Sequence, residues 1–356
     1  MNSHLRRAIG TALLGSLGLI ALAGCGEDSG GPGGADSKTV TLVSHNSFAV
    51  SKAVLAEFTE KTGYKVRRQT GGDAGSAVNQ AILSKDHPQG DVFFGVDNTL
   101  LSRALDHDLF TPYRAKDLDR VPAEFQLDAG EHRVTPVDYG DICVNYDRAY
   151  FADKKLAPPR TFADLTKPAY KNLLVTENAA TSSPGLGFLL GTAARYGDEG
   201  WKGYWKKLRA NGVEVVDGWE QAYFDRFSGG GKGDKPLVVS YASSPPAGVA
   251  DLKTKPAKAP TGVATGTCFR QVEFAGLLNG ASNTKGGKAL LDFLLSKRFQ
   301  ADVPLSMYVN PAREDVKLPE LFTRYGVEIA DPATLSPQKI SKNREPWVKA
   351  WSSLVL

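Results

Sequence analysis

Short strand-like runs alternate with segments of helical period along the first third of the folded part of this 356-residue chain. Val40–Ser44 has the composition of a strand, and Val54, Leu55 and Phe58 then fall on one face of a helix. Asp91–Val96 reads DVFFGV, a continuous apolar run typical of a strand buried on both faces of a parallel sheet. This alternation predicts an α/β fold built on a parallel sheet.

The alternation is interrupted twice, near 134–146 and near 262–274, where the sequence has no helical period and reads as long strands. The segment between them predicts strands and helices of its own, at 172–175, after Ser183, at 200–210, at 213–216, from Trp219 and at 237–241. We therefore expect two α/β lobes joined by crossing strands, with a cleft that a hinge can close. The expected first lobe is discontinuous and comprises residues 39–137 and 268–315. The second lobe is expected at 138–267 and a C-terminal helical segment at 316–356.

The N-terminus predicts a lipoprotein signal peptide over residues 1–24. Arg6 and Arg7 precede a short apolar stretch at 12–23, which ends in Leu-Ala-Gly followed by Cys25. The sequence order favours lipidation of Cys25 over an ordinary secretory signal with an incidental cysteine. We expect the mature protein to be extracytoplasmic and held to the cell membrane by this lipid.

Residues 25–38 are predicted to be a flexible tether, because Gly, Ser and acidic residues cannot bury a core. No later stretch is long and apolar enough to predict a transmembrane helix. Without the leader the chain has 41 basic and 39 acidic residues, a net charge of +2. This balance argues against nucleic acid as a partner.

Two cysteines remain after Cys25, namely Cys143 and Cys268. An oxidising location permits a disulfide between them, and the two expected crossing strands could bring them within reach. Two buried thiols are the alternative that the sequence leaves open.

Five polar loops follow strands or precede helices, where open α/β sheets bind ligands. They are His45–Phe48, Gly71–Gly75, Thr181–Gly185, Asp217–Glu220 and Tyr241–Pro245. Helix capping and turn formation also explain Asp73, Ser182 and Ser183. Together the loops offer hydroxyls, aromatic rings and carboxylates, which suit a small, polar, aromatic and cationic ligand.

Motifs of catalysis are missing from the sequence. It has no Gly-x-Ser-x-Gly, no His-Glu-x-x-His and no Walker A sequence, and no two histidines have metal-ligand spacing. We therefore expect a binding protein rather than an enzyme, with neither a cofactor nor a resident metal.

The same loops resemble the thiamine-binding subunit, a solute-binding lipoprotein, of bacterial ABC importers. The resemblance covers nearly the whole mature chain and is sharpest at Gly95–Leu101, Pro136–Asp147, Ser183–Leu190, Gly218–Tyr223 and Val238–Pro245. It implies a type II periplasmic-binding-protein fold, with two lobes, hinge strands and thiamine in the cleft between them.

The resemblance also implies a set of contacts with the ligand. The positions matching the family's contacts are Asp73, Ala74, Ser182, Ser183, Trp219, Tyr241, Ser243 and Ser244. Three family aromatics are replaced, by His45, Ala247 and Ser306, and Tyr308 or Tyr139 could supply the missing rings. We include His45, Asp138, Tyr139 and Tyr308 in the predicted ligand-binding set.

The predicted function is capture of thiamine or a thiamine phosphate by a monomer that delivers it to a membrane permease. The alternative is a binding protein of the same fold for ferric ion or another small solute, with His45, Asp73 and Tyr241 as hard ligands for iron. Ferric binders of this fold tend to carry adjacent tyrosines, whereas Ala242 follows Tyr241 here.

Overall fold

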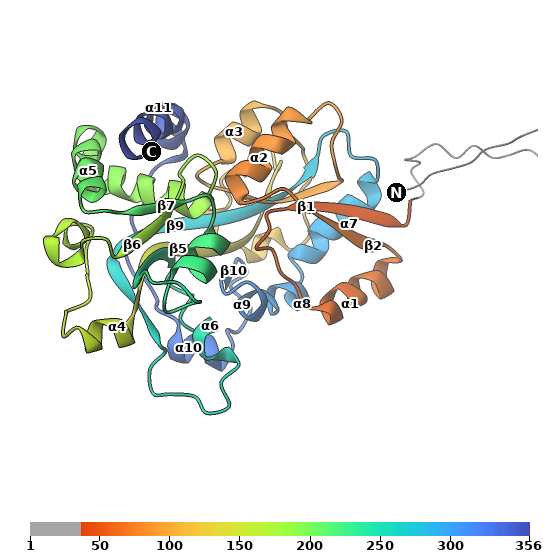
Figure 1. The fold of residues 1–356 in the computed structure, drawn as a ribbon. Coiled ribbons are helices and arrows are strands. Elements are labelled where there is room, and N and C mark those ends of the chain that lie inside the picture. Colours follow the sequence, from red (N-terminus) through yellow and green to blue (C-terminus); the bar gives the residue numbers. More distant parts are fainter. Residues whose placement is uncertain (1–36) are drawn as a thin grey trace, which may run out of the picture. The chain divides into compact units, whose positions relative to one another are not determined.

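The structure in Figure 1 is a computed structural model that describes residues 37–356. The predicted signal peptide at 1–24, the lipidation site Cys25 and tether residues 25–36 lie outside the described residues. The last two tether residues already belong to the fold, because the carbonyl oxygens of Ser37 and Lys38 accept hydrogen bonds from Asn283 Nδ2 (2.8 Å) and Lys65 N (2.7 Å). Among the helices of residues 37–356, none has the length and apolar character needed to cross a membrane.

One continuous sheet runs through the described chain in the order β2-β1-β3-β9-β5-β8-β6-β7, with β4 beside β9 and β10 beside β5. Neighbours within the groups β2-β1-β3 and β8-β6-β7 are parallel, as the strand–helix alternation predicts. The strand bounds are β1 Thr39–Ser44, β2 Lys65–Thr70, β3 Val92–Asp97, β4 Phe110–Thr111, β5 Thr135–Asp147, β6 Leu174–Glu177, β7 Glu214–Val216, β8 Leu237–Tyr241, β9 Thr261–Leu278 and β10 Asn310–Pro311.

The two parallel groups are joined by β5 and β9, which pair antiparallel from Thr135 opposite Ala275 to Asp147 opposite Thr261. These are the two segments that the sequence predicts as crossing strands. The C-terminal half of β9 pairs with β3, and the C-terminal half of β5 pairs with β8. The fold is therefore the two-lobed type II periplasmic-binding-protein arrangement with hinge strands, whereas the residue bounds of the lobes remain a prediction.

Helices cover both faces of the β2-β1-β3 group (Figure 1), and each face has its own core. On one face α2 and α3 pack over Val43 and Phe93, and on the other α1 and α7 pack over Leu42 and Phe94. The helix bounds are α1 Lys52–Thr62, α2 Ala74–Leu83, α3 Leu101–Asp106, α4 Arg148–Asp153, α5 Ser183–Ala210, α6 Ala247–Ala250, α7 Thr284–Leu294, α8 Lys297–Gln300, α9 Val303–Ser306, α10 Glu320–Tyr325 and α11 Pro337–Val355.

Two helices differ from the prediction. The helices expected after Ser183 and at 200–210 follow each other directly in α5, where Gly197 (φ 72°, ψ 175°) breaks the axis. The helix expected from Trp219 is a π-helical segment, Gln221–Arg226.

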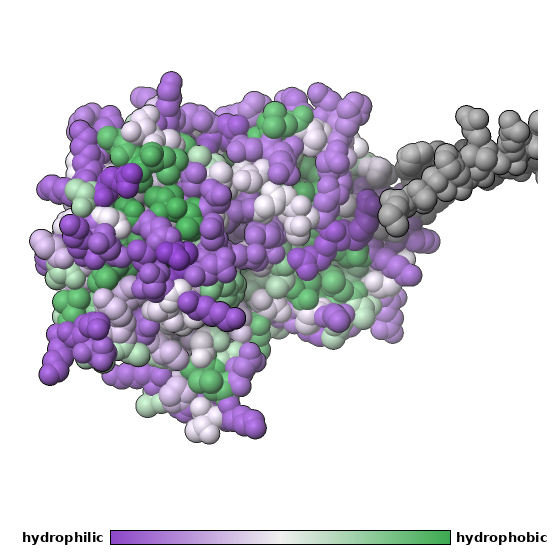
Figure 2. Space-filling view, viewed as in Figure 1, coloured by the Kyte–Doolittle hydropathy of each residue, from purple (hydrophilic) through white to green (hydrophobic). Residues whose placement is uncertain are grey.

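The C-terminal segment ends in α11, which packs on α5 and also touches α3. Trp351 is buried against Trp205 with ring centroids 5.4 Å apart at 89°, and Trp347 lies edge-on to Trp201 at 6.4 Å. Hydrophilic side chains cover most of the face shown in Figure 2, and apolar side chains form smaller groups there.

A disulfide joins Cys143 of β5 to Cys268 of β9, with an S–S distance of 2.09 Å. We expect neither cysteine to react with an alkylating reagent in the unfolded, non-reduced protein. Because the bond closes a loop with a sequence separation of 125 residues, Cys143→Ala with Cys268→Ala should lower the free energy of unfolding by about 2–5 kcal/mol. Denaturant titration measures this loss, and alkylation of both thiols in the wild type would contradict the bond.

Glu177 ends β6 and is fully buried, and neither of its carboxylate oxygens is hydrogen-bonded to another residue within 37–356. Burial raises the pKa of Glu177 well above its usual range, so its contribution to stability is present at low pH and is lost as pH rises through the folded pKa. Glu177→Gln should therefore stabilise the protein by about 1–3 kcal/mol at pH 8 and by less at pH 5, as measured by thermal unfolding. Thr176→Val is the matched control, because it removes a buried hydroxyl that cannot titrate and should change stability equally at both pH values. An equal effect of Glu177→Gln at both pH values would contradict this prediction.

Candidate ligand-binding site

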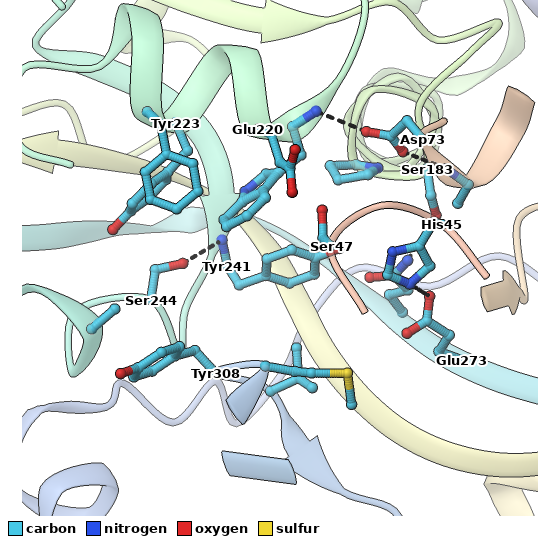
Figure 3. A pocket seen from close by; sticks show the side chains of 18 of the residues that line it. His45, Ser47, Asp73, Ser183, Glu220, Tyr223, Tyr241, Ser244, Glu273 and Tyr308 are labelled. Atoms are coloured by element: carbon cyan, nitrogen blue, oxygen red, sulfur yellow. Dashed lines mark hydrogen bonds and ion pairs between the residues drawn. The ribbon is translucent and has the colours of Figure 1, made fainter. Parts of the chain in front are cut away.

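A cavity of about 360 Å³ lies between loops from the two halves of the sheet (Figure 3). One wall comes from the loop after β1 and the start of α2, and the facing wall comes from the start of α5, the Trp219 segment and the loop after β8. Strand β9 contributes Gln271 and Glu273, and the segment after α9 contributes Met307 and Tyr308.

The structure brings most of the predicted ligand-binding residues together at this cavity. Those that line it are His45, Asp73, Ala74, Ser183, Trp219, Tyr241, Ser244 and Tyr308. Four others lie outside the lining, namely Ser182, Ser243, Asp138 and Tyr139. Ser47 and Glu220, which belong to two of the five candidate loops, also line the cavity. Sequence reasoning missed further lining residues, among them Tyr223, Phe224, Gln271, Glu273 and Met307.

Asp73 joins the two walls of the cavity. As the N-cap of α2 it accepts a hydrogen bond from Ala74 N at 2.6 Å through Oδ1. Its Oδ2 accepts from Trp219 N at 2.8 Å and from Ser182 Oγ at 3.2 Å, both on the opposite wall. The sequence left open whether Asp73 serves the turn or pairs with a cationic ligand, and these bonds explain why a carboxylate is needed here without a ligand.

The starts of α2 and α5 approach each other closely beside Asp73. Ser76 N donates to the carbonyl oxygen of Thr181 at 3.0 Å. A side chain at Gly75 would place its Cβ 2.7 Å from that same oxygen, so only glycine permits the approach. Ser182 occupies the N-cap position of α5, but its hydroxyl is bonded to Asp73 and makes no capping bond.

Ser183 belongs to a buried polar cluster below the cavity. Its hydroxyl bonds to Asp97 of β3, and Gln271 Nε2 donates to both Ser183 Oγ (2.7 Å) and Asp97 Oδ2 (2.6 Å). Asp97 also accepts from the Thr99 hydroxyl at 2.6 Å. These bonds satisfy the Asp97 carboxylate and connect β3, α5 and β9 at the base of the site.

Aromatic rings form the wall contributed by the π-helical segment. Trp219 stacks on Tyr223 with centroids 5.1 Å apart at 24°, and Phe224 lies edge-on to Trp219 at 5.5 Å. The indole nitrogen of Trp219 donates to Ser240 Oγ at 2.9 Å, which fixes the orientation of the ring. This wall can stack a planar heterocycle and attract a positive charge.

Small residues, Ala247 and Ser306, line the cavity at two positions where the resemblance implies aromatic rings. Ser306 is the last residue of α9. Tyr308 lines the cavity and stacks on Phe322 at 6.3 Å, so its ring is available there. Tyr139 is not available, because its ring packs against Phe125 (4.8 Å) and under the Arg270 guanidinium (5.1 Å), outside the lining.

His45 takes the position of a third family aromatic and faces Glu273, as Figure 3 shows. Its Nε2 lies 3.1 Å from Glu273 Oε1, an ion-pair distance without the alignment of a directed hydrogen bond. Gly95 of β3 makes room for the imidazole, because a Cβ at Gly95 would lie 2.3 Å from His45 Cδ2. Burial lowers the pKa of His45, but the charges of Glu273, Asp73 and Asp97 outweigh this effect and the pKa is raised.

Asp138 lies directly opposite Glu273 in the β5–β9 pairing, behind the cavity. It is buried and its Oδ2 has no hydrogen-bond partner among the described residues. Burial and the neighbouring Glu273 hold the pKa of Asp138 well above its usual range. Ionisation of Asp138 is therefore disfavoured in this position.

Carboxylates outnumber basic side chains at the cavity lining, where His45 is the basic group among the described residues. Asp73, Glu220 and Glu273 line it, and none of its lining residues in the described chain is lysine or arginine. Nowhere within residues 37–356 do three or more His, Cys, Asp or Glu side chains gather in a way that could hold a metal ion. The lining suits a planar ligand that carries positive charge and hydrogen-bonding groups.

Known proteins of similar sequence bind small solutes. The chain is 29% identical to the thiamine-binding periplasmic protein of Salmonella typhimurium, over 89% of this chain and 93% of the relative. It is 28% identical to the thiamine-binding periplasmic protein of Brucella suis, over 88% of this chain and 91% of the relative.

Solved structures of similar fold lead to the same family. A periplasmic thiamin binding protein superimposes with a TM-score of 0.77 and 26% identity, over 89% of this chain and 96% of the other. Iron-bound HitA from Pseudomonas aeruginosa shares the fold, with a TM-score of 0.71, 17% identity and coverage of 89% and 99% of the two chains. Residues 88–330, more than half of the chain, match the family described as bacterial extracellular solute-binding protein, and the chain belongs to that family.

Proposed function

We propose that this protein captures thiamine, or a thiamine phosphate, outside the cytoplasm and delivers it to an ABC importer in the membrane. The observation that carries this proposal is the cavity, which combines the Trp219 aromatic wall with three carboxylates and has neither lysine nor arginine among its described lining residues. Thiamine is a cation with two heteroaromatic rings, so stacking and charge pairing both favour it. The relatives of similar sequence carry thiamine in their descriptions.

A phosphate group on the ligand would be bound by backbone amides rather than by basic side chains. The first turn of α5 reaches the cavity at Ser183, and N–H groups at a helix start attract anions. At the start of α2, by contrast, the N–H groups of Ala74 and Ser76 are already bonded to Asp73 and Thr181. Calorimetric titration with thiamine, its monophosphate and its diphosphate ranks the three ligands and tests the proposed function directly.

Ferric ion is the alternative ligand. His45, Asp73 and Tyr241 line the same cavity, and iron-binding proteins share the fold. The bonds of Asp73 to Trp219 N and Ser182 weigh against it, because a metal would have to displace them. A visible iron–phenolate absorbance on addition of ferric citrate, without heat from thiamine, would favour iron.

Trp219→Ala should weaken thiamine binding by about 1–3 kcal/mol, roughly tenfold to a hundredfold, because the ligand loses its stacking surface. Trp219→Phe is the matched control, since it keeps an aromatic ring and, like Trp219→Ala, loses the indole N–H that bonds Ser240. Titration calorimetry measures both affinities, and thermal unfolding checks that the Trp219–Ser240 bond is not needed for folding. Equal affinity of the wild type and Trp219→Ala would show that the ligand does not stack on this wall.

We also propose that the lipid on Cys25 anchors the protein and that the folded part acts as a monomer without catalytic activity. Cys25→Ser should leave the protein soluble after cell fractionation while its affinity for thiamine is unchanged. A mutant protein that stays with the membranes after a high-salt wash would show that something other than the lipid anchors it.

A further inference from the structure

The carboxylates at the cavity differ in how much bonding capacity they retain for a ligand. Asp73 has little, because Oδ1 is bonded to Ala74 N and Oδ2 to Trp219 N and Ser182 Oγ. Glu220 is exposed at the rim and accepts from Asn46 Nδ2 at 2.9 Å, so water screens its charge. Neither residue is a strong partner for a buried positive charge.

Glu273 is the carboxylate with capacity to spare. It is only 9% exposed, it lines the cavity, and within residues 37–356 no N–H group forms a directed hydrogen bond to it. Its nearest cationic group is the His45 imidazole, at 3.1 Å and poorly aligned. Its other close partner is the Asp138 carboxyl on β5, which brings no positive charge, so Glu273 retains the capacity to pair with a ligand cation.

The groups around His45 and Glu273 are acidic on nearly every side. Asp73 before α2, Asp97 at the end of β3 and Asp138 on β5 surround the pair, and the phenol of Tyr241 on β8 faces it. The guanidinium of Arg344 on α11 interacts with the charge of Asp97 in this group. His45 is therefore the group that neutralises Glu273 when it carries a proton.

We propose that Glu273 pairs with the positive charge of the ligand and that His45 gives up its proton when the ligand binds. The two cations compete for one carboxylate, since an imidazolium 3.1 Å from Glu273 would repel a thiazolium placed against the same oxygen. Capture of the cation is thus coupled to release of a proton from His45 Nε2 to solvent. This inference rests on the proposed function, because it takes thiamine as the cation.

The coupling has a defined pH dependence. Protons compete with the ligand below the pKa of His45, which lies above the ordinary value of about 6.5. Affinity for thiamine should therefore rise with pH through that pKa, by up to about tenfold per pH unit on the acidic side, and level off above it.

Proton release can be counted without changing the protein. The wild type is titrated with thiamine in a calorimeter, at one pH near neutrality and in buffers of different ionisation enthalpy. The slope of the observed heat against the ionisation enthalpy of the buffer gives the number of protons released. We expect release of between about half a proton and one proton. An NMR titration of the imidazole protons should show the pKa of His45 falling when thiamine is added.

Variants assign the two roles. His45→Gln cannot titrate, so it should bind thiamine without releasing a proton. Its affinity for thiamine should be the same at pH 6 and at pH 8. Glu273→Gln should weaken thiamine about tenfold to a hundredfold, but should affect a neutral isostere, with carbon in place of the thiazolium nitrogen, far less. Asp73→Asn is the matched control, and should weaken the two ligands equally because it breaks the contact between the walls.

The outcomes separate this inference from the proposed function. Thiamine binding by the wild type with no proton release and no change in the His45 pKa overturns the inference and leaves the proposed function intact. A charge-selective loss in Asp73→Asn rather than Glu273→Gln also overturns it. A wild type that does not bind thiamine overturns both.

Discussion

The antiparallel pairing of β5 with β9 is the constraint on which the rest of the structure depends. Each strand is long enough to enter both halves of the sheet, so the same two segments hold β3 on one side and β8 on the other. Because the cavity lies where these halves meet, its base is built from strand residues such as Gln271 and Glu273 rather than from mobile loops. A site with a rigid base and two loop walls keeps its polar groups in position while the walls move.

The site concentrates acidic groups at a cost in folding stability. Burying Asp97, Asp138 and Glu273 near one another is unfavourable unless each is hydrogen-bonded, protonated or paired. The structure compensates each one differently: Asp97 is bonded to Ser183 and Gln271, Asp138 has a raised pKa, and Glu273 contacts His45. A cationic solute would neutralise the remaining negative charge. The same carboxylates that lower the folding stability therefore serve the proposed function.

Much of this arrangement could be predicted from the sequence. The carboxyl ends of parallel strands share one edge, so the loops after β1 and β2 had to lie together, and His45 and Asp73 both line the cavity. The parallel rule does not place Tyr241 there, because β8 runs opposite to β1 across the antiparallel strands β9 and β5. Glu273 could not be predicted, because side chains alternate between the faces of a strand. Which face of β9 looks into the cavity depends on register shifts near Asp138 and Val144 that leave no signal in the sequence. The same alternation explains Tyr139, whose ring lies outside the lining and packs on Phe125.

Helix α11 contacts both halves of the sheet and so restricts how the halves can move apart. It packs mainly on α5, through the Trp351 and Trp205 rings, and it reaches α3 through the ion pair of Glu345 with Arg103. Since α5 and α3 belong to opposite halves of the sheet, separating the halves would break the contact of α11 with α3 and keep its larger contact with α5. The C-terminus would therefore move with the α5 half. The ion pair between half-buried Arg103 and exposed Glu345 is screened by salt, so this contact between the halves weakens as ionic strength rises.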